Sequence, residues 1–240
     1  LAQTKSIKEK IKQEKLSFNG RPIELEAFVH GALCVAHSGR CFMSQHHDRL
    51  SANRGQCLQE CRKKYRITDI EDPRREFVLG EDYVMSPKDL CALPLLPQLL
   101  HAGIDVLKIE GRAKGPQYVY EVTKAYREAL DAIEKGVFDD ALVTQLLERL
   151  ERVFNRGFTD NFLLGVPTND SWTKFYGSSA TQKKEKLGPV TNFYPKASVA
   201  AINIEEDRVW RPGDEVVFSG RTAGLSRCIV EGLRLDDQSV

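Results

Sequence analysis

The feature that most constrains this chain is a group of four cysteines that falls within 28 consecutive residues. Cys34, Cys41, Cys57 and Cys61 are separated by six, fifteen and three residues. The surrounding segment, residues 32–65, is rich in polar and basic residues and shows little hydrophobic periodicity. Because such a segment has few apolar side chains with which to offset the entropy of ordering, we expect loops and short helices held by something other than a core.

Four cysteines in one short segment indicate metal binding. Thiolates are soft ligands, and four of them hold either a tetrahedral zinc ion or an iron–sulfur cluster. Structural zinc usually takes its ligands in two close pairs, and the six-residue gap between Cys34 and Cys41 fits that pattern poorly. The alternative is a set of buried or incidental thiols, which we expect instead for Cys91 and Cys228 in their apolar surroundings.

Composition excludes several classes of protein. The 240 residues are 41% hydrophobic with a net charge of +1, which excludes a disordered chain and a polycation. The richest apolar stretch, residues 90–100, contains two prolines and is shorter than the ~20 residues that a bilayer requires. The lysine-rich start has no apolar run behind it, so we expect no secretory signal, no membrane contact and a cytoplasmic protein. The first residue is Leu1, which suggests a fragment or a processed chain.

Basic residues are concentrated in the same segment as the cysteines. Between residues 40 and 66 there are seven basic side chains against two acidic ones. This excess could steer a phosphate backbone, offset the charge of a thiolate-bound cluster, or simply be solvated. The candidates for RNA contact are Arg40, Arg54, Arg62, Lys63 and Lys64.

Hydrophobic periodicity predicts alternating strands and helices up to about residue 154. Helices are expected over residues 4–15, 86–103, 117–135 and 138–154, and strands over residues 23–29 and 104–109. An acidic surface turn is expected at residues 69–76 and a hairpin around Gly80 over residues 77–85. This alternation predicts an α/β layer with parallel strands.

The pattern changes near Gly157. Residues 157–185 are rich in Gly, Asn, Ser and Thr, which indicates a linker or a crossing segment. Short β-type runs then appear at residues 197–204, 215–219 and 227–233. We therefore expect three parts: residues 1–156, a segment over residues 157–185, and a small β-barrel or sheet domain over residues 186–240.

Three blocks of residues together resemble the collagenase-like peptidase family U32. The first runs from Glu26 to Cys34 and continues through Ser38-Gly39-Arg40-Cys41 to Ser44. The second is Asn53-Arg54-Gly55-Gln56-Cys57 followed by Cys61-Arg62, and the third is Lys108-Ile109-Glu110-Gly111-Arg112. The resemblance implies part of a TIM-like βα barrel followed by a small β-barrel domain. It also implies that an amino-terminal portion, which completes the barrel, is missing.

Despite the family name, the resemblance implies oxygen-insertion chemistry. Many members hydroxylate transfer RNA, ribosomal RNA or the ubiquinone ring, and several hold a 4Fe–4S cluster, here on Cys34, Cys41, Cys57 and Cys61. The run over residues 152–158 and the β domain are most similar to the branch that forms 5-hydroxyuridine at the tRNA wobble position with prephenate. The alternatives are a peptidase, although no Gly-x-Ser-x-Gly or His-Glu-x-x-His motif is present, and a non-catalytic, metal-stabilised RNA-binding module.

Candidate catalytic residues follow from the barrel that this resemblance implies. Lys108, Glu110 and Arg112 lie at the carboxyl end of a predicted strand, where barrel enzymes place their sites. Alternation places Lys108 and Glu110 on one face, so we expect an ion pair that is either catalytic or structural. Arg112 could bind a carboxylate or phosphate. Glu26 and His30 end another strand and are candidates too, whereas His37, His46 and His47 are expected to be solvated or satisfied histidines.

Overall fold

The chain divides into two units, which are described separately. The computed structural model describes residues 1–37, 40–79, 85–175, 177–205, 210–220, 224–235 and 238–239. Unit 1 comprises Leu1–Thr181 and unit 2 comprises Gln182–Val240. Residues 157–181, which the sequence assigns to a linker or crossing segment, belong to unit 1. They contribute a strand to its sheet and several backbone hydrogen bonds, such as that from the Thr173 amide to the Ser86 carbonyl (3.0 Å).

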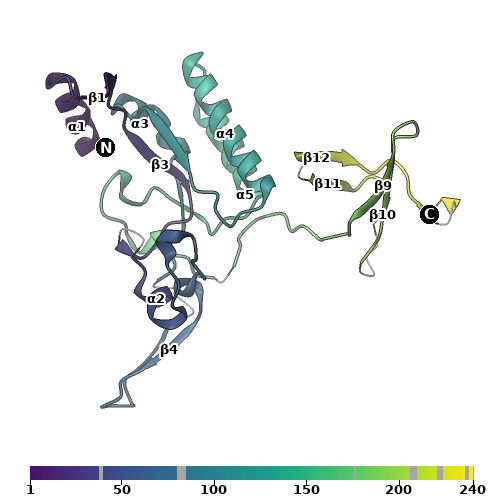
Figure 1. The fold of residues 1–240 in the computed structure, drawn as a ribbon, viewed down its shortest axis with the longest axis horizontal. Helices are drawn as coiled ribbons and strands as arrows, with labels where there is room; N and C mark the ends of the chain where they lie inside the picture. The colour runs from purple at the N-terminus through teal and green to yellow at the C-terminus, as the bar shows by residue number, and fades with distance from the viewer. Residues whose placement is uncertain are drawn as a thin grey trace. The chain divides into compact units, whose positions relative to one another are not determined.

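A mixed four-stranded sheet forms the centre of unit 1 (Figure 1). Its order is β7 (Val106–Ile109), β3 (Glu26–Gly31), β6 (Asp89–Cys91) and β8 (Phe158–Thr159). The pairs β3–β7 and β6–β8 are parallel, whereas β3–β6 is antiparallel. The ends of β3 and β7 therefore lie at the same edge of the sheet as the beginnings of β6 and β8.

The antiparallel pairing corrects the prediction of a purely parallel layer. To place two consecutive strands parallel to each other, the chain between them must cross back along the whole length of the sheet. Between β3 and β6 the chain instead forms the cysteine segment and a hairpin, and it then re-enters the sheet beside the point where it left. Among the described residues the strands close into no barrel in either unit.

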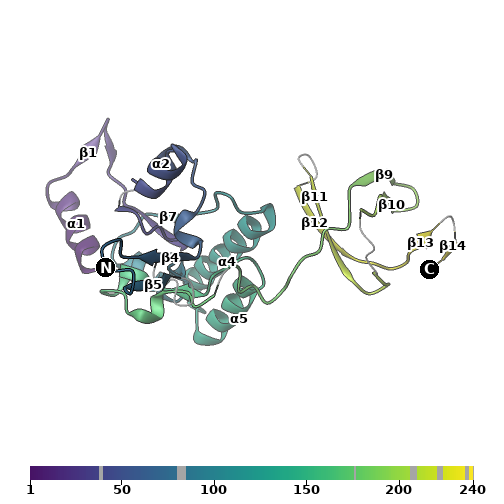
Figure 2. The same ribbon diagram turned by 90° about the horizontal axis from the view of Figure 1, so that it is seen from below.

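Helices α3 (Leu96–His101), α4 (Pro116–Glu134) and α5 (Asp140–Glu151) supply the apolar core of unit 1. The two long helices lie side by side (Figure 2), and both were predicted from their apolar spacing. The fully buried side chains of the core include Val29, Leu93, Leu96, Leu99, Val122, Leu146 and Leu150.

The helix predicted over residues 86–103 is only partly correct. Strand β6 and a 3-10 helix (Leu93–Leu95) occupy its first half, and α3 begins only at Leu96. Both prolines of this stretch, Pro94 and Pro97, lie in the first turn of their helices. A proline fits a first helical turn but disrupts a helix interior, so the chain cannot form one continuous helix here.

The amino-terminal helix and the cysteine segment complete unit 1. Helix α1 (Ala2–Gln13) matches the prediction and is followed by the short hairpin of β1 (Ser17–Phe18) and β2 (Arg21–Pro22). The cysteine segment contains α2 (Phe42–Asp48) and two 3-10 helices (Ala52–Arg54 and Glu60–Arg62). Two further 3-10 helices, Asn161–Leu163 and Asn169–Ser171, follow β8.

The hairpin after the cysteine segment is placed differently from the prediction. Strands β4 (Tyr65–Thr68) and β5 (Glu76–Leu79) pair across the acidic turn, and the hairpin extends away from the sheet (Figure 1). The Asp69 carboxylate accepts the Glu71 and Asp72 amides (2.9 and 3.2 Å), which fixes the turn there. Residues 77–79 thus form a strand that pairs with β4, while Gly80 and the turn predicted around it lie outside the described residues.

Unit 2 consists of β-hairpins, as the sequence predicts. The described strands form three antiparallel pairs: β9 (Val190–Tyr194) with β10 (Val199–Ile202), β11 (Glu215–Gly220) with β12 (Gly224–Ile229), and β13 (Arg234–Leu235) with β14 (Gln238–Ser239). In the whole described chain, no helix is both long and apolar enough to span a bilayer.

Candidate functional site

The cysteine segment leaves the sheet at Gly31, where the backbone allows no other residue without strain. Gly31 has a φ of 119°, and a Cβ atom at this position would lie 2.5 Å from the Glu110 carbonyl oxygen. The Glu110 amide in turn donates to the His30 carbonyl (2.8 Å). The ends of β3 and β7 are thereby held in close contact, directly before the first cysteine.

Arg62 attaches the far end of the cysteine segment to the same edge of the sheet. Its guanidinium donates to Ser86 Oγ (2.7 Å), to the Pro87 carbonyl (2.8 Å) and to the Leu33 carbonyl (2.6 Å), and the residue is 8% exposed. Burial lowers the pKa of Arg62, and the neighbouring Arg156 lowers it further. This placement does not fit the predicted RNA contact of Arg62, because its guanidinium is buried and hydrogen-bonded within the protein.

The other four cations proposed for RNA contact are on the surface. Arg40, Arg54, Lys63 and Lys64 are all exposed. Lys63 forms an ion pair with Glu60 (2.6 Å), which leaves its amine at the surface but partly neutralised. We call these four residues the basic patch.

Three of the four cysteine sulfurs accept backbone amides. Ala36 N donates to Cys34 Sγ (3.3 Å), Ser44 N to Cys41 Sγ (3.4 Å) and Gln59 N to Cys57 Sγ (3.4 Å). Hydrogen bonds of this kind stabilise a thiolate more than a thiol. The Ser44 hydrogen bonds accordingly lower the pKa of Cys41.

Cys61 is partly buried, and the other three cysteines affect the pKa of its thiol. Burial raises the pKa of its thiol; Arg62 opposes this rise, and Cys34, Cys57 and Cys41 each add to it electrostatically. Three sulfurs therefore lie near enough to act on the fourth. The structure brings together all four cysteines that the sequence proposes as ligands.

The spacing of the sulfurs bears on which of the two metal centres they would fit. Zinc–sulfur bonds of about 2.3 Å place tetrahedral thiolates roughly 3.8 Å apart. Among the described residues, the only three His, Cys, Asp or Glu side chains with ligand atoms mutually within 4.8 Å are His47, Asp48 and Glu60. No three of the four sulfurs therefore lie as close together here as they would around one zinc ion, whereas a cluster binds each thiolate to a different iron. Four thiolates are the ligand set of a 4Fe–4S cluster, and the choice of metal centre stays a prediction.

The His47–Asp48–Glu60 group is explained by its own contacts. His47 Nδ1 lies 2.9 Å from Asp48 Oδ1, and the Glu60 carboxylate accepts Lys63 Nζ and the Tyr65 hydroxyl (3.0 Å). His47 is exposed, and its hydrogen bond with Asp48 raises its pKa. His37 and His46 are exposed as well.

The predicted ion pair between Lys108 and Glu110 is not formed. Lys108 Nζ instead binds Glu26 Oε1 (2.8 Å) and lies 5.0 Å from the Phe28 ring centroid. Parallel pairing places Phe28 opposite Lys108, so Glu26 is within reach of the lysine. Glu110 lies beyond the end of β7, where its carboxylate accepts the Arg112 amide (2.7 Å).

Arg112 lies beside the cysteine segment. Its side chain is exposed, and its terminal nitrogen is 3.9 Å from the position that a Cβ atom would take at Gly55. Arg112, one of the five proposed catalytic residues, therefore carries an exposed charge and lies close to the cysteine segment.

His30 faces the helices. It is 2% exposed, its Nδ1 lies 3.3 Å from the Tyr126 hydroxyl, and its ring packs against Tyr118 and Phe158. Burial, followed by repulsion from Lys114, lowers the pKa of His30 to about 3. The side chain is therefore neutral at physiological pH and is held as part of the core.

This burial predicts a specific pH dependence of stability. Between about pH 6.5 and pH 3 the unfolded chain binds a proton at His30 that the folded chain does not, so the free energy of unfolding falls as the pH falls. Each pH unit contributes up to about 1.4 kcal/mol from this residue. Urea denaturation at pH 7, 6, 5 and 4 should show a shallower decline for His30→Phe than for the parent, with the exposed His47→Gln as the control. Parallel curves for the parent and His30→Phe would contradict this assignment.

Three further charged residues at this edge of the sheet were not expected from the sequence. Asp89 and Arg156 form a buried ion pair (3.4 Å) whose side chains are 1% and 7% exposed. Arg156 also donates to Gln59 (2.9 Å), which lies between two of the cysteines. Lys114 lies nearby and interacts electrostatically with both members of the pair. The available signal was a single carboxylate, Asp89, at the start of an otherwise apolar stretch.

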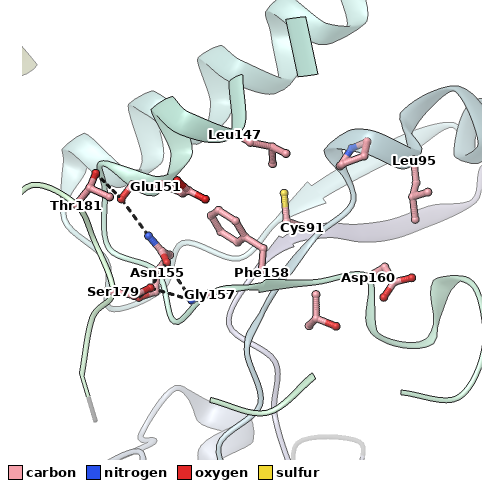
Figure 3. Close-up of a pocket in the computed structure, with 12 residues that line it drawn as sticks. Cys91, Leu95, Leu147, Glu151, Asn155, Gly157, Phe158, Asp160, Ser179 and Thr181 are labelled. Carbon is pink, nitrogen blue, oxygen red and sulfur yellow. Dashed lines mark hydrogen bonds between the residues drawn. The ribbon is translucent and has the colours of Figure 1, made fainter. Parts of the chain in front are cut away.

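A separate cavity of about 650 Å³ lies against α5 and β8 (Figure 3). It is lined by Cys91, Leu147 and Phe158 and bounded by Asn155, whose amide donates to the Glu151 carbonyl (3.2 Å). None of the four proposed cluster ligands and none of the proposed catalytic residues lines it. The cavity is therefore distinct from the cysteine site.

Comparison with known proteins identifies the family. The model of peptidase family U32 matches residues 2–173. A protein named "Collagenase" from Porphyromonas gingivalis is 40% identical over 239 residues, which cover 99% of this chain and 57% of that protein. "tRNA hydroxylation protein P1" from Bacillus subtilis is 34% identical over 202 residues, 82% of this chain and 47% of that protein.

A third relative is named for ribosomal RNA. The "23S rRNA 5-hydroxycytidine C2501 synthase" of Escherichia coli is 39% identical over 145 residues, which cover 58% of this chain and 22% of that protein. No solved structure matches the chain. The chain spans little more than half the length of the collagenase-named relatives. The family match covers most of unit 1, including all four clustered cysteines, and the chain belongs to peptidase family U32.

Proposed function

We propose that this chain is part of an RNA hydroxylation protein that holds a 4Fe–4S cluster on Cys34, Cys41, Cys57 and Cys61. The observation that carries the proposal is the set of three amide hydrogen bonds to cysteine sulfurs around the partly buried Cys61. Four thiolates with amide donors are the ligand environment that such clusters use, and hydrogen bonds to the sulfurs tune their potentials.

The surrounding residues have defined parts in this proposal. When bound, the cluster supplies one-electron transfer. Arg62 holds the ligand segment against the sheet, and Arg156 positions Gln59 between two of the ligands. Near the cysteine segment there are three cationic side chains, Arg62, Arg156 and Lys114, but only one buried carboxylate, that of Asp89. The resulting excess of positive charge offsets the negative charge of four thiolates.

The proposed substrate is transfer RNA, hydroxylated at the wobble uridine to give 5-hydroxyuridine. Support comes from the relatives named for tRNA hydroxylation, one of which aligns with 82% of this chain. Prephenate or a related small carboxylate is the proposed co-substrate. Arg112 is the candidate to bind its carboxylate, because its guanidinium is exposed beside the cysteine segment.

We further propose that the longer protein completes a TIM-like barrel. Strands β7 and β8 are the outer strands of the sheet, and the collagenase-named relatives extend well beyond this chain. An amino-terminal portion would add the remaining strands and their helices. We also propose a cytoplasmic location, because a tRNA substrate is found there and cysteine thiols stay reduced in that compartment.

The proposed function is tested by nucleoside analysis. Transfer RNA from a strain that lacks this protein should contain no 5-hydroxyuridine by mass spectrometry, and the gene for the full-length protein should restore it. The same gene with Cys57→Ala should not. Unchanged 5-hydroxyuridine in the deletion strain would overturn the proposal.

The basic patch gives a second prediction. Replacing Arg54 and Lys64 together by alanine should weaken tRNA binding and reduce the slope of log affinity against log salt by about 2, because each lost phosphate contact removes close to one released counterion. The matched control replaces Lys124 and Lys135, which are exposed on or beside α4. A slope equal to that of the parent would mean that the basic patch is ordinary solvated surface and does not contact RNA.

A peptidase is the second candidate, favoured by the 40% identity to a protein named "Collagenase". A cysteine peptidase needs a thiolate hydrogen-bonded to a base. Among the described residues no hydrogen bond joins a cysteine to a histidine, and cysteines bound to a cluster are not free nucleophiles. This candidate would be favoured if the purified protein cleaved gelatin. The activity would have to remain with the protein through every purification step and be lost in a site variant.

A further inference from the structure

Gln59 has a backbone conformation that is uncommon for its residue type. It lies between Cys57 and Cys61, directly before the 3-10 helix Glu60–Arg62, and has φ 59° and ψ 40°. These angles fall in the left-handed region, which glycine adopts freely and which costs other residues conformational energy. Such a conformation persists at a glutamine only where the surrounding structure holds it, and strain of this kind is concentrated at functional sites.

Two hydrogen bonds hold Gln59 in this conformation. Arg156 Nη2 donates to Gln59 Oε1 (2.9 Å), and the Arg62 amide donates to the Gln59 carbonyl (2.8 Å). Arg156 is itself buried and paired with Asp89 on β6 (3.4 Å). Although Gln59 is exposed, its side chain is therefore anchored to the central sheet through a buried ion pair.

The conformation of Gln59 determines which contacts the neighbouring peptide groups make. The peptide group before it donates its N–H to Cys57 Sγ (3.4 Å). The peptide group after it accepts the Arg62 amide and so begins the 3-10 helix that carries Cys61. Because φ and ψ of Gln59 set the angle between these two peptide groups, the left-handed turn allows both contacts to form at once.

We propose that Gln59 is a positioning residue for the cysteine site. Its hydrogen bond to Arg156 holds the left-handed turn, and the turn directs an amide at Cys57 Sγ. An amide that donates to a ligand sulfur raises the reduction potential of an iron–sulfur cluster, because it stabilises the added negative charge of the reduced form. The inference rests on the proposed 4Fe–4S cluster and assigns control of its potential and retention to a residue that is not a ligand.

Two substitutions separate the turn from the side chain that holds it. Gln59→Met keeps the length of the side chain and the strain of the turn, but it cannot accept the hydrogen bond from Arg156. Gln59→Gly also loses that hydrogen bond, yet glycine adopts the left-handed turn without strain. A structural role in which the side chain only fills space predicts the opposite order, with glycine as the more damaging change.

The full-length protein and both variants are purified without oxygen for two measurements. One is the reduction potential of the cluster, and the other is the chelator concentration that removes half of the iron. For Gln59→Met we expect a more negative potential and about tenfold weaker retention of iron, as is typical when a group that orients a metal ligand is lost. For Gln59→Gly both values should lie closer to those of the parent.

Gln56→Met is the matched control. Gln56 is an exposed glutamine directly before Cys57, and its Oε1 accepts the Ser51 amide (3.4 Å). Its replacement should leave the potential and the iron retention unchanged, and thermal unfolding of all three variants checks that they fold. Parent values for Gln59→Met, or a larger loss for Gln59→Gly than for Gln59→Met, would overturn this inference and leave the proposed cluster in place. A parent protein without iron and sulfide would overturn the proposed function, and this inference with it.

Discussion

Replacing Cys57 by alanine is expected to abolish iron binding. Cys57 supplies one of the four sulfurs, and its amide hydrogen bond from Gln59 is lost together with the thiolate. Because the cysteine segment has only a small apolar core of its own, loss of the cluster should also make the segment less ordered. Anaerobically purified variant should contain only background iron and lack absorbance near 400 nm, while the parent is brown.

The matched control for this variant is Cys228→Ala. Cys228 is a free, exposed cysteine on β12 in unit 2, outside the group of four. Its replacement should leave the iron content of the protein unchanged. Equal iron in the Cys57→Ala variant and the parent would show that the ligand assignment is wrong.

Replacing Arg156 by methionine is expected to lower the free energy of unfolding by about 3–5 kcal/mol. The substitution leaves the buried carboxylate of Asp89 without its ion-pair partner, and an unpaired buried charge costs far more than a lost surface pair. Urea denaturation monitored by circular dichroism measures the change. The exposed pair of Arg127 and Asp131 is the control, since Arg127→Ala should cost less than about 1 kcal/mol.

A double variant separates the ion pair from simple loss of packing. If the unpaired carboxylate causes the destabilisation, adding Asp89→Val to Arg156→Met should recover part of the loss, because no buried charge then remains. Additive losses in the double variant would mean that the two side chains act independently and that the pair contributes nothing of its own.

The sequence was sufficient where a single segment carries the whole signal. Helices α4 and α5 were predicted because their apolar residues recur at helical spacing over several turns. The four cysteines were identified as one group from their proximity in the chain. Strand β6 was missed because it has only three residues, which lie inside an apolar stretch that also fits a helix.

Contacts between distant segments were not predictable in the same way. Lys108 pairs with Glu26 because two strands lie in one particular register, and no local pattern specifies it. Arg62 and Arg156 are buried although arginine is usually exposed, so a sequence-based prediction assigns them to the surface or overlooks them. Their burial depends on backbone carbonyls and on Asp89, which the fold brings to them.

The most direct test of the central claim is the metal content of the full-length protein purified without oxygen. Iron, inorganic sulfide and zinc are quantified on the same sample, and Mössbauer spectroscopy identifies the iron species. We predict about four iron atoms and four sulfides per chain, in the form of a 4Fe–4S cluster. One zinc ion per chain with no sulfide, or no stoichiometric metal at all, would contradict the account.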